Sequence, residues 1–79
     1  MTVKPKSEFD QYVSAAVRQK RIAQDITQAD LAIGIGVTDG FISQVESPKS
    51  PSKYNLNHLN KIAKYLGCSP RDFLPEKPL

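Results

Sequence analysis

The segment Thr27–Ser47, TQADLAIGIGVTDGFISQVES, most constrains what this chain can fold into, because it predicts two helices that are each too short to be stable alone. Thr27 and Thr38 are typical N-cap residues, and each stands directly before a run with helical apolar spacing. Gly36 ends the first run, since glycine readily takes the positive φ that closes a helix. Only residues 36–38 then separate the helices, and so short a turn makes them cross at a steep angle.

The apolar residues of this segment predict which sides of the two helices are buried. Leu31, Ala32 and Ile35 form the buried side of the first helix, whereas Ile42 and Val45 form that of the second. Ala32 is small enough to let the two helices approach closely where they cross. The polar side of the second helix, about residues 38–47, is then expected to project from the molecule.

Three further helices are expected, each preceded by a residue that can cap its first turn. These capping residues are Ser7, Asn55 and Ser69. The first helix should end near Asp25 and the fourth at Gly67. The side chains expected to pack on the core from these helices include Phe9, Leu56 and Leu74. Since no strand-like alternation appears, we predict an all-α domain over residues 8–74, with a flexible N-terminal tail (1–7) and a C-terminal tail (75–79).

Composition limits the classes of function that need to be considered. The chain has 79 residues, of which 39% are hydrophobic, and a formal charge of +3, which suits one small domain and is compatible with a polyanionic partner. Its single cysteine, Cys68, and single histidine, His58, can form neither an internal disulfide nor a metal site, so no cofactor is expected. No apolar run approaches the roughly 20 residues of a membrane span, and the polar N-terminus lacks a hydrophobic signal core, so we expect a cytoplasmic, nucleoid-associated protein.

The pattern resembles the helix-turn-helix domain of phage repressors and Cro, the XRE-type family. The resemblance is carried by the TQADLA opening, Ala32, Gly36, Ile42 and Val45. VRQKR at 17–21 is similar to the first helix of that family, and LNKIAKYLGCSPRDFL at 59–74 is similar to its last two helices. The likeness covers about residues 9–74 and implies a compact five-helix bundle of the lambda-repressor-like DNA-binding type.

The resemblance also implies where double-stranded DNA is bound. The third helix of the family enters the major groove, and its exposed residues reach base edges. By position, the base-contacting candidates are Thr38, Asp39, Gly40, Ser43 and Gln44. Gln44 is the strongest of them, because its amide can bond adenine N6 and N7 together. The phosphate-contacting candidates are Thr27, Gln28, Arg21, Lys49, Ser50 and Lys53. Arg21 and Glu46 also resemble a family pair that bridges the first helix to the third.

The start of the third helix and the loop after it differ from the family pattern. Asp39 is acidic where the groove is rich in phosphate, so it needs a cytosine amine as its partner. Gly40 lowers helix propensity by roughly 1 kcal/mol relative to alanine. Phe41 could contact a thymine methyl group or belong to the core. The loop after Glu46 is longer than usual and contains Pro48.

Two hypotheses of function follow from these observations. The first is a sequence-specific DNA-binding transcription regulator, a repressor, that works as a homodimer because one recognition helix reads only a few base pairs. Its dimer surface is expected on the last two helices and the C-terminal tail. The alternative is a protein-interaction module, such as an antitoxin or an adaptor with weak or no DNA binding, and the acidic, glycine-containing start of the third helix motivates it. An enzyme is not expected, because one histidine serves neither a catalytic triad nor a metal site.

Overall fold

The computed structural model describes residues 6–79, and this part of the chain forms four α-helices and no strand. The α-helices are α1 (Glu8–Ala23), α2 (Gln28–Ile35), α3 (Asp39–Glu46) and α4 (Leu56–Leu66). The prediction of a fifth α-helix is wrong, because Pro70–Phe73 forms a single turn of 3-10 helix, η1. Its bonds run between residues three apart, from the Asp72 N–H to the Ser69 carbonyl and from the Leu74 N–H to the Arg71 carbonyl. Four residues are too few to establish the α-helical ladder before the chain extends again.

All five predicted capping residues are confirmed, because each accepts a hydrogen bond from a backbone N–H in the first turn of its helix. They are Ser7, Thr27, Thr38, Asn55 and Ser69. In α1, α2 and η1 an aspartate three residues later accepts a bond from the backbone N–H of the cap. These reciprocal bonds satisfy donors that a helix start otherwise leaves without partners. The helix boundaries in this sequence are therefore largely encoded locally.

Three of the four α-helices end in the same way, with one residue in the left-handed conformation. These residues are Asp25 (φ 57°), Gly36 (φ 76°) and Gly67 (φ 72°). In each case the next N–H donates at 3.0 Å to the carbonyl five residues earlier, which satisfies a carbonyl of the last helical turn. The predicted ends at Asp25, Gly36 and Gly67 are confirmed, whereas α3 ends in extended backbone at Ser47.

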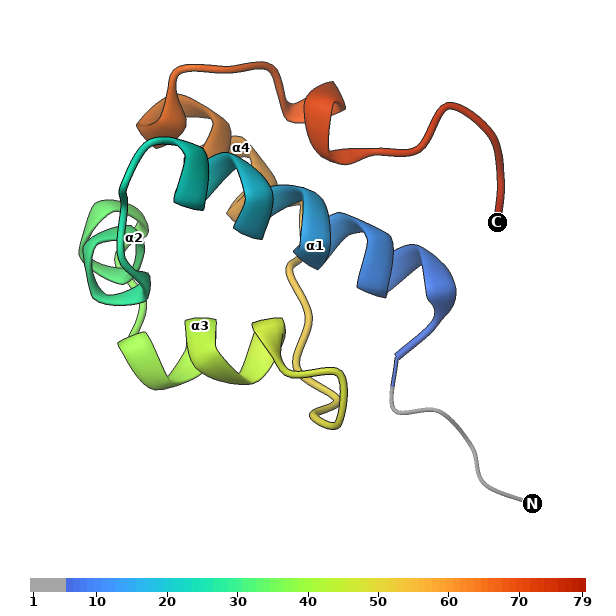
Figure 1. The fold of residues 1–79 in the computed structure, drawn as a ribbon, viewed down its shortest axis with the longest axis horizontal. Helices are drawn as coiled ribbons and strands as arrows, with labels where there is room; N and C mark the ends of the chain where they lie inside the picture. The colour runs from blue at the N-terminus through green and yellow to red at the C-terminus, as the bar shows by residue number, and fades with distance from the viewer. Residues whose placement is uncertain (1–5) are drawn as a thin grey trace.

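The helices enclose one core, and α1 lies between α3 on one side and the C-terminal segment on the other (Figure 1). The fully buried side chains are Val17, Leu31, Ile42, Val45, Ile62 and Phe73. Three residues expected in the core are exposed instead: Phe9, Leu56 and Leu74. Leu56 is the first residue of α4 and is 80% exposed, because the apolar side of that helix begins only at Leu59. None of the helices in residues 6–79 is long and apolar enough to cross a membrane.

The structure differs from the predicted N-terminal tail at Lys6 and Ser7. Residues 1–5 lie outside the described part of the chain, but Lys6 does not behave as part of a tail, because its side chain is only 3% exposed. Ser7 likewise belongs to the helical domain as the cap of α1. At the other end, residues 75–79 form neither helix nor strand.

Candidate nucleic-acid interface

The turn between α2 and α3 has the geometry that the sequence predicts. Gly36 adopts its left-handed conformation, and the Val37 N–H donates to the Ala32 carbonyl at 3.0 Å. The Thr38 hydroxyl then accepts the Phe41 N–H at 3.1 Å, which starts α3 directly after the turn. Figure 1 shows α2 nearly end-on while α3 lies across the view, so the two helices cross steeply. The chain does not continue as one straight helix through Gly36, an arrangement that would exclude a helix-turn-helix.

The two sides of α3 differ sharply in burial. Ile42 and Val45 are fully buried against the rest of the domain. The predicted base-contacting residues are all exposed: Thr38, Asp39, Gly40, Ser43 and Gln44. Phe41 is half-buried and packs against the core, with its ring edge-on to Tyr54 at a centroid distance of 6.1 Å. The outward side of α3 is therefore polar and available to a partner, whereas Phe41 is part of the inner surface.

A surface depression of about 580 Å³ joins the start of α2 to the start of α3. It is lined by Arg21, Thr27, Gln28, Ala29, Asp39, Gly40 and Ser43. The structure thus brings together predicted phosphate-contacting residues of α2 and predicted base-contacting residues of α3. The N-termini of both helices face this region, and the positive end of a helix dipole favours an anion.

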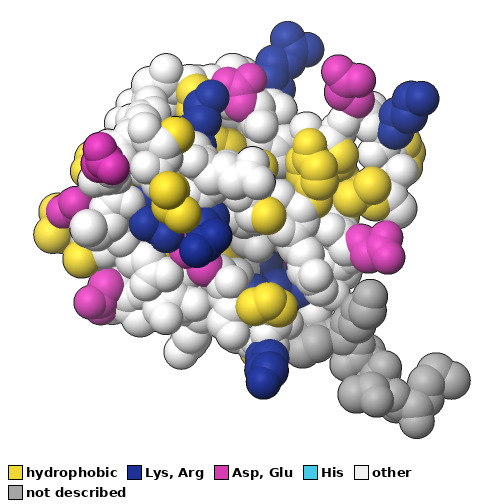
Figure 2. Space-filling view, in the orientation of Figure 1, with side chains coloured by type: hydrophobic (Ala, Val, Ile, Leu, Met, Phe, Trp, Pro, Cys, Tyr) yellow, Lys and Arg dark blue, Asp and Glu magenta, His cyan; other side chains and the backbone are white. Residues whose placement is uncertain are grey.

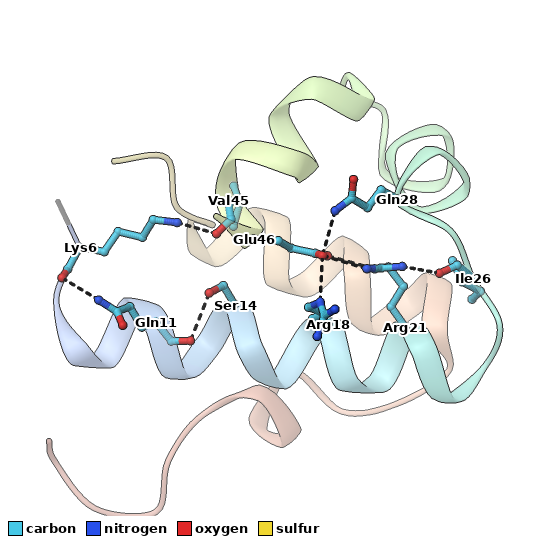
Figure 3. A network of polar contacts seen from close by, with 9 residues as sticks. All are labelled: Lys6, Gln11, Ser14, Arg18, Arg21, Ile26, Gln28, Val45 and Glu46. Carbon is cyan, nitrogen blue, oxygen red and sulfur yellow. Dashed lines mark hydrogen bonds and ion pairs between the residues drawn. The ribbon is translucent and has the colours of Figure 1, made fainter. Parts of the chain in front are cut away.

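The carboxylate of Glu46, the last residue of α3, is the centre of a polar network that joins three helices (Figure 3). Arg21 of α1 binds it with two bonds, from Nε to Oε2 at 3.0 Å and from Nη2 to Oε1 at 2.8 Å. Gln28 of α2 donates to Oε1 at 3.0 Å, and the Arg18 Nε lies 3.6 Å from the same oxygen. Because the Glu46 side chain is 4% exposed, it depends on these donors instead of water. The predicted pair of Arg21 and Glu46 is confirmed.

Arg21 and Gln28 have part of their hydrogen-bonding capacity engaged in this network. Arg21 also donates from Nη1 to the Ile26 carbonyl at 2.8 Å, and its side chain is largely buried. This geometry favours a structural role for Arg21 over the predicted phosphate contact. Gln28 is half-buried, and Figure 3 shows its amide oxygen pointing away from Glu46. One amide N–H of Gln28 therefore remains for a contact outside the network.

The remaining phosphate-contacting candidates lie in the loop between α3 and α4. Lys49 and Lys53 are exposed and Ser50 is half-buried. The Lys53 ammonium lies 3.7 Å from the carboxylate of Asp10 at the start of α1, which keeps this part of the loop beside α1. The loop that carries these lysines begins at the C-terminal end of α3, the opposite end of that helix from Thr27 and Gln28, and Lys53 lies beside α1.

Two residues that the sequence analysis did not assign to this region hold α3 in place. Lys6 donates from Nζ to the backbone carbonyls of Gln44 and Val45 (its bond to Val45 is drawn in Figure 3). Burial lowers the pKa of the Lys6 ammonium, and the nearby charge of Asp10 partly offsets that effect. Ser52 donates from its hydroxyl to the side-chain oxygen of Gln44 at 3.1 Å. Neither contact has a signal in the sequence, since both depend on how distant segments pack.

Comparison with known proteins decides the family. A sequence profile of the Cro/C1-type HTH DNA-binding domain matches residues 17–75. The chain belongs to this helix-turn-helix family. A search of curated protein sequences gave no match.

Solved structures share the Cro/C1-type fold of this chain. The restriction-modification controller protein C.AhdI from Aeromonas hydrophila is 23% identical, with a TM-score of 0.71 over 81% of this chain and 94% of that one. The clp gene regulator ClgR from C. glutamicum is 24% identical, with a TM-score of 0.74 over 86% of each chain. A hypothetical transcription factor, NHTF, from Neisseria is 21% identical, with a TM-score of 0.75 over 95% of this chain and 85% of that one.

Membership in the Cro/C1-type family makes this protein a DNA-binding transcription regulator. The matched range contains Arg21, Gln28 and Glu46, so the polar network lies within the family domain. Lys6 lies outside that range, although it contacts α3. Across residues 6–79, no three histidine, cysteine or acidic side chains are grouped as a metal site would require.

Proposed function

We propose that this protein is a sequence-specific repressor that inserts α3 into the major groove of double-stranded DNA, in the cytoplasm and on the nucleoid. The observation that carries the proposal is the contrast between the two sides of α3. Ile42 and Val45 are fully buried, whereas the polar residues between and before them face outward. The major groove is wide enough for one α-helix, and base edges there carry a distinct pattern for each base pair.

The exposed residues divide into two roles in this proposal. The base contacts come from Thr38, Asp39, Gly40, Ser43 and Gln44, with Gln44 as the principal reader of adenine. The phosphate contacts come from Thr27 and Gln28 at one end of α3 and from Lys49, Ser50 and Lys53 at the other. Arg21 is a positioning residue, because its guanidinium is held by Glu46 and by the Ile26 carbonyl. Phosphate contacts at both ends would fix the register of α3 along the groove.

The protein acts as a homodimer in this proposal, and an apolar patch supports a surface for it. Phe9, Tyr12, Leu56 and Leu74 are large apolar residues that are partly or mostly exposed. Leu74 lies in two adjoining depressions, one shared with Phe9 and Leu56 and the other with Tyr12. Figure 2 shows hydrophobic side chains gathered between α1 and the C-terminal segment. None of the four belongs to α2 or α3, so a second copy on this patch leaves the reading side of α3 available.

Binding to a pool of random duplexes, followed by a salt titration on the selected sequence, tests the function. We expect a preferred sequence and a steep loss of affinity with salt, because phosphate contacts release counterions. Gln44→Ala should remove the preference at one base pair and cost about 1–3 kcal/mol there. Lys53→Ala should weaken all sequences alike and reduce the salt slope by about one. Lys77→Ala, which removes the same charge from the C-terminal segment, is the control and should do neither.

The dimer surface has its own test. Leu56→Asp places a charge in the apolar patch without touching the core, because Leu56 is exposed. The variant should shift the mass measured by light scattering toward the monomer and weaken binding to a two-half-site duplex. An unchanged mass would place the interface elsewhere on the molecule.

The exposed Asp39 at the start of α3 is the observation that favours the alternative function, a protein-interaction module. An exposed carboxylate in that position is unfavourable beside phosphates unless a cytosine amine meets it. Under this alternative, the pure protein binds no duplex even at low salt, and Asp39→Asn does not create binding. Specific binding that Asp39→Asn alters at a single base pair supports the regulator instead.

A further inference from the structure

Gln44 is exposed, yet its side-chain amide is held by a contact from another segment. The hydroxyl of Ser52 donates to the Gln44 Oε1 at 3.1 Å, across eight positions of sequence. Ser52 is half-buried in the loop that follows α3, and Gln44 projects from the outward side of the helix. An exposed glutamine normally samples many rotamers, so a bond to a less mobile neighbour restricts it.

The loop keeps Ser52 in position through contacts of its own. The Ser50 N–H donates to the Ser47 carbonyl at 3.2 Å, which turns the chain just beyond α3. The Ser52 N–H then donates to the Ser50 hydroxyl at 3.2 Å. The ion pair of Lys53 with Asp10 ties the next residue to α1. These contacts return the loop to the side of α3.

The bond fixes where the Gln44 amide lies. A hydroxyl can donate to an amide oxygen or accept from an amide nitrogen, so Ser52 can hold the amide in either of its two orientations. In the observed arrangement the Ser52 hydroxyl donates to the Gln44 oxygen. The second lone pair of that oxygen and both protons of the nitrogen remain for a partner. The bond therefore restricts the rotamer of Gln44 and leaves its amide able to form two bonds to a base.

We propose that Ser52 is a positioning residue that makes the Gln44 contact specific for adenine on one strand. The inference rests on the proposed docking of α3 in the major groove. Adenine presents an acceptor at N7 and a donor at N6, and A·T and T·A pairs display these groups in different places across the groove. A Gln44 side chain held in one rotamer reaches these groups in only one of the two places, whereas a free side chain can follow them to both.

The test measures the affinity of wild type and Ser52→Ala for duplexes in which each base pair of the selected site is changed in turn. Gln44→Ala identifies the base pair that Gln44 reads. At that pair, Ser52→Ala should reduce the preference for A·T over T·A by about two- to twelvefold, which corresponds to one hydrogen bond. Preferences at other positions and the salt slope should stay unchanged, because the number of phosphate contacts is the same.

Matched variants separate positioning from other roles of Ser52. Ser52→Thr keeps the hydroxyl and should keep the preference. Ser14→Ala removes a hydroxyl that donates to the Gln11 carbonyl within α1, and it should change nothing. In a Gln44→Ala background, Ser52→Ala should have no further effect on sequence preference, because the group that it orients is gone.

The possible outcomes distinguish this inference from the function on which it rests. If wild type binds no duplex, both fail. If wild type binds specifically but Ser52→Ala weakens every sequence by the same factor, Ser52 is a phosphate or loop residue and the inference alone is overturned. The same holds if the A·T preference at the Gln44 pair survives in Ser52→Ala. Equal unfolding midpoints of the variants exclude a general loss of structure, and the Gln44 side-chain amide signals in NMR should shift in Ser52→Ala without DNA.

Discussion

The C-terminal ends of α2 and α3 are held by opposite means. At the end of α2, Gly36 turns left-handed and the Val37 N–H bonds a carbonyl five residues back, so the end is closed by its own neighbours. At the end of α3, Ser47 is extended and the helix contains no basic residue in its last turn. The last carbonyls of α3 instead meet the ammonium of Lys6, which comes from the start of the chain.

This difference teaches how the reading helix is positioned. The hydrogen bonds of the turn into α3 are local, since they join residues within one helical turn of Gly36. The far end of α3 is fixed by α1 through Glu46, by the N-terminal segment through Lys6, and by the following loop through Ser52. Changes at the turn should therefore act mainly on stability, whereas changes at the far end should also alter what Gln44 reads.

The largest effect is expected at the far end, from Glu46→Ala. The substitution leaves the buried guanidinium of Arg21 without its carboxylate, which should lower the free energy of unfolding by about 3 kcal/mol or more. Urea denaturation at neutral pH measures the change. Glu8→Ala, at an exposed position in the first turn of α1, is the control and should lose less than about 1 kcal/mol. A loss of similar size in both variants would show that the network does not anchor α3.

The next largest effect is expected at the C-terminal end of α2, where a substitution at Gly36 is compared with one at Gly40. Gly36→Ala should lower the free energy of unfolding by about 1–2 kcal/mol, because the left-handed conformation strains a residue with a Cβ. The reason is conformation and not space, since nothing lies within 4 Å of a Cβ built there. Gly40→Ala is the matched control, because its φ is not positive and the nearest atom, the Thr38 Oγ1, is 4.0 Å away. It should raise the free energy of unfolding by about 0.5 kcal/mol in thermal or urea unfolding. If both variants raised or both lowered the stability, the left-handed conformation of Gly36 would not be the cause.

The locally closed elements are the ones that the sequence predicted well. The caps at Thr27, Thr38 and Asn55 and the ends at Gly36 and Gly67 were all readable, because each depends on residues within one turn. The outward side of α3 and the pair of Arg21 with Glu46 were also predicted, the first from apolar spacing and the second from family resemblance. What the sequence placed correctly is thus either short-range or carried by the family pattern.

Two of the contacts that hold the far end of α3, those of Lys6 and Ser52, were not predicted. The sequence places Lys6 in a tail, although its side chain is buried at the end of α3, and nothing in the sequence distinguishes Ser52 from the rest of its loop. The sequence predicts a fifth helix but not its 3-10 type, because capping residues mark where a helix starts and do not say how far its hydrogen bonds extend. The contact of His58 is easier to read from the sequence, since its place three residues after Asn55 is the position from which a side chain can complete a capping box.

A smaller effect at the far end is expected from Lys6→Met. The side chain keeps its length but loses the ammonium that bonds the carbonyls of Gln44 and Val45, which should cost about 1 kcal/mol of unfolding free energy. Lys53→Met removes an exposed ammonium from its pair with Asp10 and should cost less than about 0.5 kcal/mol. In DNA binding the order of the two effects should be reversed, because Lys53→Met reduces the salt slope. If Lys6→Met lowers the free energy of unfolding no more than Lys53→Met does, the bonds from Lys6 to the last carbonyls of α3 do not stabilise the helix.

The smallest effect concerns His58, where the loop from α3 enters α4. Its Nδ1 accepts the Asn55 N–H at 3.0 Å, and its ring lies 5.1 Å from that of Phe41 between centroids. Burial, and to a lesser degree the charge of Lys61, lower the pKa of His58 below its ordinary value of 6.5. The unfolded chain therefore binds the proton more readily. The neutral His58 ring therefore stabilises the folded state. This contribution to the free energy of unfolding is complete above about pH 6.5 and is lost as the pH falls toward the lower pKa of the folded state.

The measurement for His58 is the free energy of unfolding at pH 7.5 and at pH 5.5. Wild type should lose up to about 1 kcal/mol between them, because a protonated ring no longer accepts the bond that completes the capping box. His58→Gln supplies an acceptor that does not titrate, so its loss over the same interval should be smaller. Equal losses in wild type and His58→Gln would assign the acid sensitivity to other groups. A smaller loss in His58→Gln would show that the start of α4, like that of α2, is stabilised by a capping box within its own first turn.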